Sequence, residues 1–162
     1  MILANQARTL DVGPYLSEAR HGVVLAQHND LERARVAREL RQNGWDVTEL
    51  EDGMELVDYL DELQSLRPPA APAVIIADVA LDGYSGLEAC AYLRELDSET
   101  PFILIAASKT STAFVEAERV GATFVLEEPL DLDDLCDVVS AYADGVDVPQ
   151  SPASEALHVL RM

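Results

Sequence analysis

The stretch Ala73-Val74-Ile75-Ile76-Ala77-Asp78 decides the fold. Pro72 precedes it, and its five apolar residues show none of the polar alternation expected of a strand with one wet face. Such a run is typical of a strand buried on both faces, as in a parallel sheet covered by helices. It ends on a carboxylate, whose burial at the mouth of a strand is costly. We therefore predict a central strand over residues 73–77, with Asp78 as a candidate functional residue at its carboxyl end.

Strand and helix signals alternate five times on either side of this stretch. Each predicted strand is followed by an amphipathic helix, and the strands are expected over residues 23–26, 45–50, 73–77, 102–106 and 123–126. Two pairs, Asn29 with Glu32 and Ser85 with Glu88, have the spacing of a capping box at a helix start. Repeated strand–helix units with buried β-branched runs predict an α/β fold with a doubly wound parallel sheet.

The chain divides into one domain and two flanking segments. The repeats occupy residues 22–145 of the 162. Residues 1–21 show no sustained hydrophobic period and are expected to be an N-terminal extension. Residues 146–162 contain Pro149 and Pro152 and are expected to be a C-terminal tail.

The charge of the chain disfavours several classes of partner. Eleven basic against 30 acidic side chains give a net charge of −19, and Lys109 is the only lysine. Binding to nucleic acid or to an anionic membrane needs clustered basic residues, so neither is expected. No apolar run is long enough to cross a membrane, and no secretory signal is recognisable. Cys90 and Cys136 are expected to be reduced, and the protein is expected to be cytoplasmic.

In a doubly wound fold the ligand site lies beyond the carboxyl ends of the strands. The residues at these ends are Gln27, His28, Asp78, Ala106 and Glu128. From its position alone, Asp78 is either a turn-forming aspartate or a nucleophile or metal ligand. No glycine-rich phosphate loop follows the first strand, and no Ser/His/Asp or Cys/His arrangement is recognisable. We therefore expect no independent enzymatic activity.

The order of these features resembles the receiver domain of bacterial two-component response regulators. The resemblance covers roughly residues 22–145, and it is carried by Val74–Asp78, Leu81 with Gly83-Tyr84-Ser85-Gly86-Leu87, Pro101–Ala107, Gly121-Ala122 and Glu128-Pro129-Leu130. It implies a flavodoxin-like five-stranded parallel sheet of order 2-1-3-4-5 with five helices. It also implies that Asp78 matches the phosphoacceptor and that Pro129 follows a cis peptide bond.

The same resemblance exposes four departures from the family's pocket. Receivers carry two acidic residues after the first strand, which hold Mg²⁺ together with the phosphoacceptor, and here these positions are Gln27 and His28. The family's Thr or Ser at the end of the fourth strand is Ala106, and its Lys before the proline is Glu128. His28 is interpreted as a hydrogen-bonding replacement rather than a metal ligand, because one His with one Asp is a poor Mg²⁺ site. We expect no cofactor, and Mg²⁺ only if Asp78 is phosphorylated.

Two functional hypotheses follow from the resemblance. The first is a stand-alone, atypical receiver of two-component signalling that acts by protein–protein contact, with little or no Mg²⁺-dependent phosphorylation. The alternative is a single-domain response regulator phosphorylated at Asp78. Expected partners are a histidine kinase, a phosphotransfer protein or another regulator. A homodimer through the acidic residues 108–145 is a further expectation.

Overall fold

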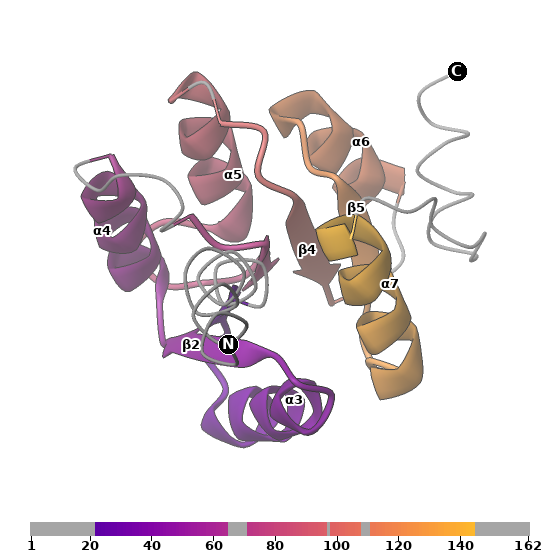
Figure 1. Cartoon of the computed structure of the whole chain (residues 1–162). Helices are drawn as coiled ribbons and strands as arrows, with labels where there is room; N and C mark the ends of the chain where they lie inside the picture. The colour runs from indigo at the N-terminus through magenta and orange to yellow at the C-terminus, as the bar shows by residue number, and fades with distance from the viewer. Residues whose placement is uncertain (1–21, 65–70, 97, 108–110, 145–162) are drawn as a thin grey trace, which may run out of the picture.

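A computed structural model describes residues 22–64, 71–96, 98–107 and 111–144. The predicted extension and tail lie outside these residues. Five parallel strands form one sheet of order β2-β1-β3-β4-β5 (Figure 1), which confirms the predicted topology. The strands are β1 (Gly22–Ala26), β2 (Asp46–Leu50), β3 (Val74–Asp78), β4 (Phe102–Ala106) and β5 (Phe124–Glu127).

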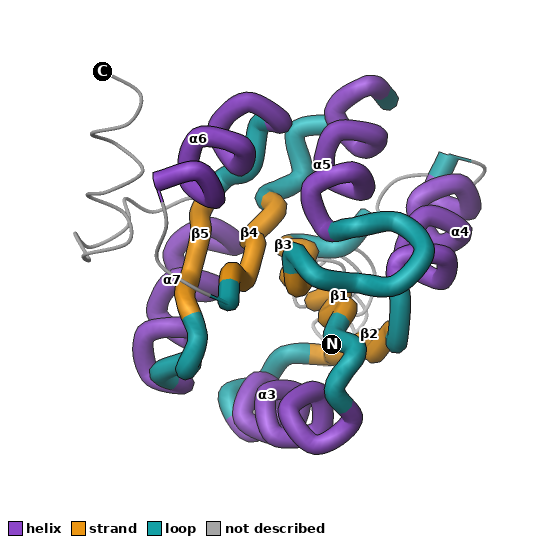
Figure 2. Tube along the Cα trace, turned by 180° about the vertical axis from the view of Figure 1, so that it is seen from behind, coloured by secondary structure: helices purple, strands orange, loops and turns teal. Residues whose placement is uncertain are grey.

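Helices cover both faces of the sheet (Figure 2). They are α3 (Asp30–Gln42), α4 (Gly53–Leu63), α5 (Gly86–Glu95), α6 (Ser111–Val120) and α7 (Leu132–Asp144). On one face α3 and α7 pack against the sheet, with Leu40 and Val139 in the core they share. On the other face α4, α5 and α6 do so, through Leu60, Leu93 and Phe114. The doubly wound arrangement follows from these two cores.

The two central strands β3 and β4 are buried on both faces, as their sequences predict. Every residue of Val74–Asp78 and of Phe102–Ala106 is buried. The register pairs Ala26 with Ala77 and Asp78 with Ile105, so the carboxyl ends of β1, β3 and β4 meet at one edge. Asp78 is the last residue of β3, not the first residue after it as predicted. Its carboxylate therefore belongs to the sheet's rim.

Side-chain caps fix three helix starts. Ser85 and Glu88 form the complete capping box predicted for α5, with bonds of 3.1 and 2.9 Å. At α3 the side chain of Asn29 accepts from the Glu32 amide at 2.9 Å, whereas the Glu32 carboxylate binds Arg35 instead of returning to the cap. At α4 the cap is Asp52, which the sequence analysis did not single out.

One half-buried arginine joins α5 to the loops beneath β4 and β5. Arg94 Nε donates to the carbonyl oxygen of Gly121 at 3.0 Å, and its Nη1 donates to the carbonyl oxygens of Ser98 and Thr100 at 3.0 and 2.9 Å. These carbonyls lie outside the strand ladders, and those of Ser98 and Thr100 are half-buried, so the guanidinium supplies a donor where water has reduced access. Arg94 therefore stabilises the loops that lead into β4 and β5, at the end of the sheet opposite Asp78.

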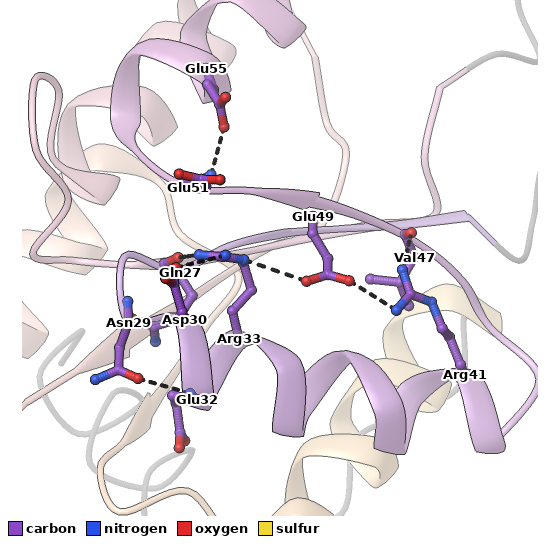
Figure 3. Close-up of polar contacts among 10 residues, drawn as sticks. All are labelled: Gln27, Asn29, Asp30, Glu32, Arg33, Arg41, Val47, Glu49, Glu51 and Glu55. Atoms are coloured by element: carbon purple, nitrogen blue, oxygen red, sulfur yellow. Dashed lines mark hydrogen bonds and ion pairs between the residues drawn. The ribbon is translucent and has the colours of Figure 1, made fainter.

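Two arginines of α3 cover the outer edge of the sheet at β2 (Figure 3). Arg41 Nη2 donates to the carbonyl oxygen of Val47 at 3.0 Å, and Arg41 Nη1 meets Glu49 Oε2 at 2.9 Å. Arg33 Nε lies 3.4 Å from Glu49 Oε1. Glu49 thus bridges two turns of the helix to the edge strand.

Both cysteines, Cys90 and Cys136, are free, in agreement with the prediction of reduced thiols. Burial raises the pKa of each thiol to about 11, so neither has the acidic character of a reactive thiolate. Within the described residues, no helix has both the length and the apolar character that a membrane span requires.

Candidate functional site

Asp78 lies almost completely buried at the carboxyl end of β3, with 3% of its surface exposed. One carboxylate oxygen, Oδ1, accepts a hydrogen bond of 3.1 Å from the backbone N–H of Ala80. The other, Oδ2, lies 3.3 Å from Nδ1 of His28. The His28 side chain is about half exposed, at 52%. The half-exposed imidazole therefore contacts both the buried carboxylate and solvent.

Burial governs the ionisation of Asp78. Loss of solvent around the carboxylate raises its pKa above the ordinary aspartate value. The Ala80 N–H, the charge and hydrogen bond of His28 and, as the smallest influence, the Gln27 side chain all act in the opposite direction. Ionisation of Asp78 is thus unfavourable in the folded protein. Of the neighbouring side chains, His28 lowers the pKa of Asp78 more than Gln27 does.

Gln27 precedes His28 and is buried, with 1% of its surface exposed. Its backbone carbonyl accepts from Arg33 Nη1 at 2.8 Å, and its side-chain oxygen accepts from the Asn29 N–H at 3.1 Å (Figure 3). Its Nε2 is the one buried side-chain nitrogen or oxygen without a hydrogen-bond partner among the described residues. Since the Gln27 side chain favours the charged form of Asp78, this unpaired donor belongs to the environment of that carboxylate.

Glu128 brings a second carboxylate to the same edge, from the loop after β5. The peptide bond between Glu128 and Pro129 is cis, as the resemblance implies. Burial, followed by the negative charges of Asp78 and Glu32, raises the pKa of Glu128, while His28 lowers it. The carboxylates of Asp78 and Glu128 therefore repel each other, and the same imidazole offsets both.

Ala106 ends β4 beside these groups. It is 3% exposed, and its carbonyl oxygen accepts a 2.9 Å hydrogen bond from the N–H of Glu128. Its methyl side chain can neither donate a hydrogen bond nor accept one. The structure thus brings all five sequence-predicted residues, Gln27, His28, Asp78, Ala106 and Glu128, to one edge of the sheet.

The side chains present do not fit a magnesium ion. Mg²⁺ requires oxygen ligands in near-octahedral geometry. Here the Oδ2 of Asp78 faces a nitrogen of His28, and the nearby Gln27 amide has a buried N–H donor to offer. Among the residues that the structure describes, no group of three or more His, Cys, Asp and Glu side chains is arranged to hold a metal ion.

Arg33 is a residue of this site that the sequence analysis missed. Its side chain is 11% exposed, and it binds the Gln27 carbonyl, Asp30 and Glu49. The signal that could have found it was its place one turn into a helix whose start is fixed by Asn29. A long cation at that point reaches back to the carbonyls of the preceding loop.

Comparison with known proteins identifies the family. The response regulator receiver domain family matches residues 23–140, and the chain belongs to it. The uncharacterized transcriptional regulatory protein YkoG of Bacillus subtilis is 31% identical over 115 residues, which cover 70% of this chain and 47% of YkoG. The response regulator MprA of Mycobacterium sp. (strain KMS) is 29% identical over 128 residues, covering 79% and 53%. Residues 23–140 of this chain therefore form a receiver domain of the two-component response regulators, which are signalling proteins.

Solved structures agree with this assignment at the level of the fold. The receiver domain of the Francisella response regulator 1452 superposes with a TM-score of 0.67 at 22% identity, covering 76% of this chain and 97% of that one. The chain spans about half the length of the curated relatives it matches. Several of these are named transcriptional regulatory proteins, so the expectation that nucleic acid is excluded is not supported for a longer protein.

Proposed function

We propose that this receiver domain acts by protein–protein contact and carries out little or no Mg²⁺-dependent phosphorylation. The observation that carries this proposal is the contact between Asp78 and His28. The buried carboxylate of Asp78 is already in contact with the imidazole of His28, whose Nδ1 lies 3.3 Å from Oδ2. The partners that fit such a module are a histidine kinase, a phosphotransfer protein or another regulator of two-component signalling.

Electrostatics supports the proposal. Phosphoryl transfer is catalysed almost wholly by positioning and by neutralising charge. Removal of one preorganised donor typically costs about 3–4 kcal/mol in the transition state. At this edge Ala106 offers no hydroxyl, and Glu128 places a negative charge near Asp78. A phosphoryl group on Asp78 would add further negative charge to a place that already holds two carboxylates.

The second candidate function is a receiver phosphorylated at Asp78. It is favoured by the position of Asp78 at the tip of the central strand, with Oδ1 oriented by the Ala80 N–H. Such a domain would switch slowly, because the groups that assist the reaction in the family are replaced.

Acetyl phosphate with Mg²⁺ separates the two candidates. We expect intact-mass measurements to show no appreciable phosphoryl adduct on the wild-type chain. Asp78→Asn is the matched control, because it keeps the shape of the side chain and removes the acceptor. An adduct on the wild type that is absent from Asp78→Asn would establish phosphorylation and overturn the contact-only proposal.

The partner surface and the oligomeric state stay predictions. A homodimer through residues 108–145 would bring two acidic surfaces together, since Glu116, Glu118, Asp131, Asp133, Asp134 and Asp137 lie in this part of the chain. Sedimentation equilibrium at low and high salt tests it. Dimerisation that strengthens with salt supports a face-to-face contact of like charges, and a monomer at all salt concentrations contradicts it.

A further inference from the structure

We propose that His28 is the residue that excludes a divalent cation from this edge of the sheet, because its imidazole occupies the position beside Asp78 Oδ2 that a metal ion would need. The inference rests on the proposed function and deepens it by naming the side chain responsible. It makes a claim about metal selectivity that can be tested without any phosphorylation reaction.

The geometry assigns this place to His28. Asp78 presents two carboxylate oxygens, of which Oδ1 is held by the Ala80 N–H and Oδ2 faces Nδ1 of His28. Arg33 binds the carbonyl of Gln27, and the N–H of Asn29 binds the Gln27 side chain, so the loop that carries His28 is held on both sides. An ion approaching Oδ2 must therefore displace a positioned imidazole.

The surrounding charges show what His28 prevents. The negative charges of Asp78 and Glu32 raise the pKa of Glu128, so three carboxylates contribute to the electrostatics of this edge. Glu32 is bound by Arg35, which leaves Asp78 and Glu128 as the pair that the imidazole offsets. A carboxylate in place of His28 would lie close to Oδ2 of Asp78 and face the same repulsion. Carboxylate oxygens that face one another without an imidazole between them form the kind of ligand set that divalent cations bind.

The test is a calorimetric titration of MgCl₂ into the whole chain and three variants. We expect the wild type to show no saturable binding. We expect His28→Asp to show saturable binding, about tenfold or more above the weakest affinity that the titration detects, because the mutation removes the imidazole from Asp78 Oδ2 and adds an oxygen ligand. The double variant His28→Asp with Asp78→Asn should lose this gain.

Leu31→Asp is the matched control for added charge. Leu31 lies at the start of α3 and is 84% exposed, so the substitution adds one negative charge near the same loop without entering the site. It should leave Mg²⁺ binding as weak as in the wild type. If Leu31→Asp gains as much affinity as His28→Asp, the effect is general charge attraction and the proposal is wrong.

The amide resonance of Ala80 gives a second measurement, because its N–H is bonded to Asp78. Added Mg²⁺ should move this resonance in His28→Asp and not in the wild type. If His28→Asp fails to fold, His28→Asn replaces it, with a smaller gain expected. No gain in either variant, or a saturable shift of Ala80 in the wild type, overturns the role of His28. The absence of a gain in the variants leaves the proposed function standing, whereas Mg²⁺ binding by the wild type would count against it as well. The acetyl phosphate experiment decides the proposed function separately.

Discussion

Gly86 lies so close to Asp78 that a methyl group on its Cα would fall 2.4 Å from the Asp78 carbonyl oxygen. The first residue of α5 and the last residue of β3 are therefore in backbone contact. The N–H of Gly86 also donates to the carbonyl of Val79 at 3.0 Å. The position of the candidate site thus depends on the absence of a side chain on the neighbouring helix.

The first prediction concerns this contact. Gly86→Ala should lower the free energy of unfolding by about 2–3 kcal/mol, because the new methyl group cannot be accommodated without moving β3 or α5. Gly44→Ala is the control, since Gly44 has a φ of +95° and a methyl group on its Cα would have no atom within 4 Å. It should cost only about 1 kcal/mol of backbone strain. Urea unfolding of both variants checks the order, and an equal loss would contradict it.

The second prediction concerns the pH dependence that Asp78 contributes. Because burial raises the pKa of Asp78 in the folded state, this group favours folding most at pH values below its unfolded pKa, and the benefit is lost as the pH rises through the folded pKa. Asp78→Asn removes the buried charge and should therefore raise the free energy of unfolding at neutral pH. Relative to the wild type, the gain should shrink towards about pH 4, the ordinary aspartate pKa. Urea unfolding across this pH range measures it, and a variant less stable than the wild type at neutral pH would contradict this sign.

The third prediction concerns Arg94. Arg94→Ala should lower the free energy of unfolding by about 1–2 kcal/mol, because it leaves the half-buried carbonyls of Ser98 and Thr100, and the exposed carbonyl of Gly121, without their charged donor. Arg119→Ala removes a side chain that is 67% exposed and paired with Glu116 one turn away. That control should change stability by about 0.5 kcal/mol or less. Thermal and urea unfolding measure both variants. Comparable losses of stability would show that the hydrogen bonds of Arg94 contribute no more than the exposed ion pair of Arg119.

The fourth prediction concerns the capping box of α5. Ser85→Ala should cost about 1 kcal/mol in thermal unfolding, since the amide of Glu88 loses its acceptor. Ser85→Asp should restore most of this loss, because aspartate caps equally well and suits the positive end of the helix dipole. Failure of aspartate to rescue stability would show that the hydroxyl acts through some contact other than the cap.

Most of the fold could be predicted from the sequence, because the buried parallel strands leave an unambiguous apolar signature. The runs ending at Ala77 and Ala106 located their strands to within a residue, and the Ser85–Glu88 spacing located the start of α5. The capping box at Glu32 is incomplete because Arg35, three residues further on, competes for the same carboxylate. Local spacing identifies a donor and an acceptor but not a nearby competitor.

The candidate site was predictable as a set of residues but not as a set of contacts. Residues that follow parallel strands must gather at one edge, which placed Gln27, His28, Asp78 and Glu128 together. The sequence predicted a hydrogen-bonding role for His28, but it did not identify Asp78 as the partner of the imidazole or show that the amide nitrogen of Gln27 would lack a partner. Those outcomes depend on side-chain conformations, which the periodicity of strands and helices does not determine.

The guanidinium of Arg41 on the Val47 carbonyl has a consequence for assembly. An exposed edge strand is a template on which another extended chain can add by backbone pairing. An extended chain that pairs with β2 would have to displace the Arg41 guanidinium from the Val47 carbonyl and from Glu49. Growth of the sheet from this side is thereby discouraged.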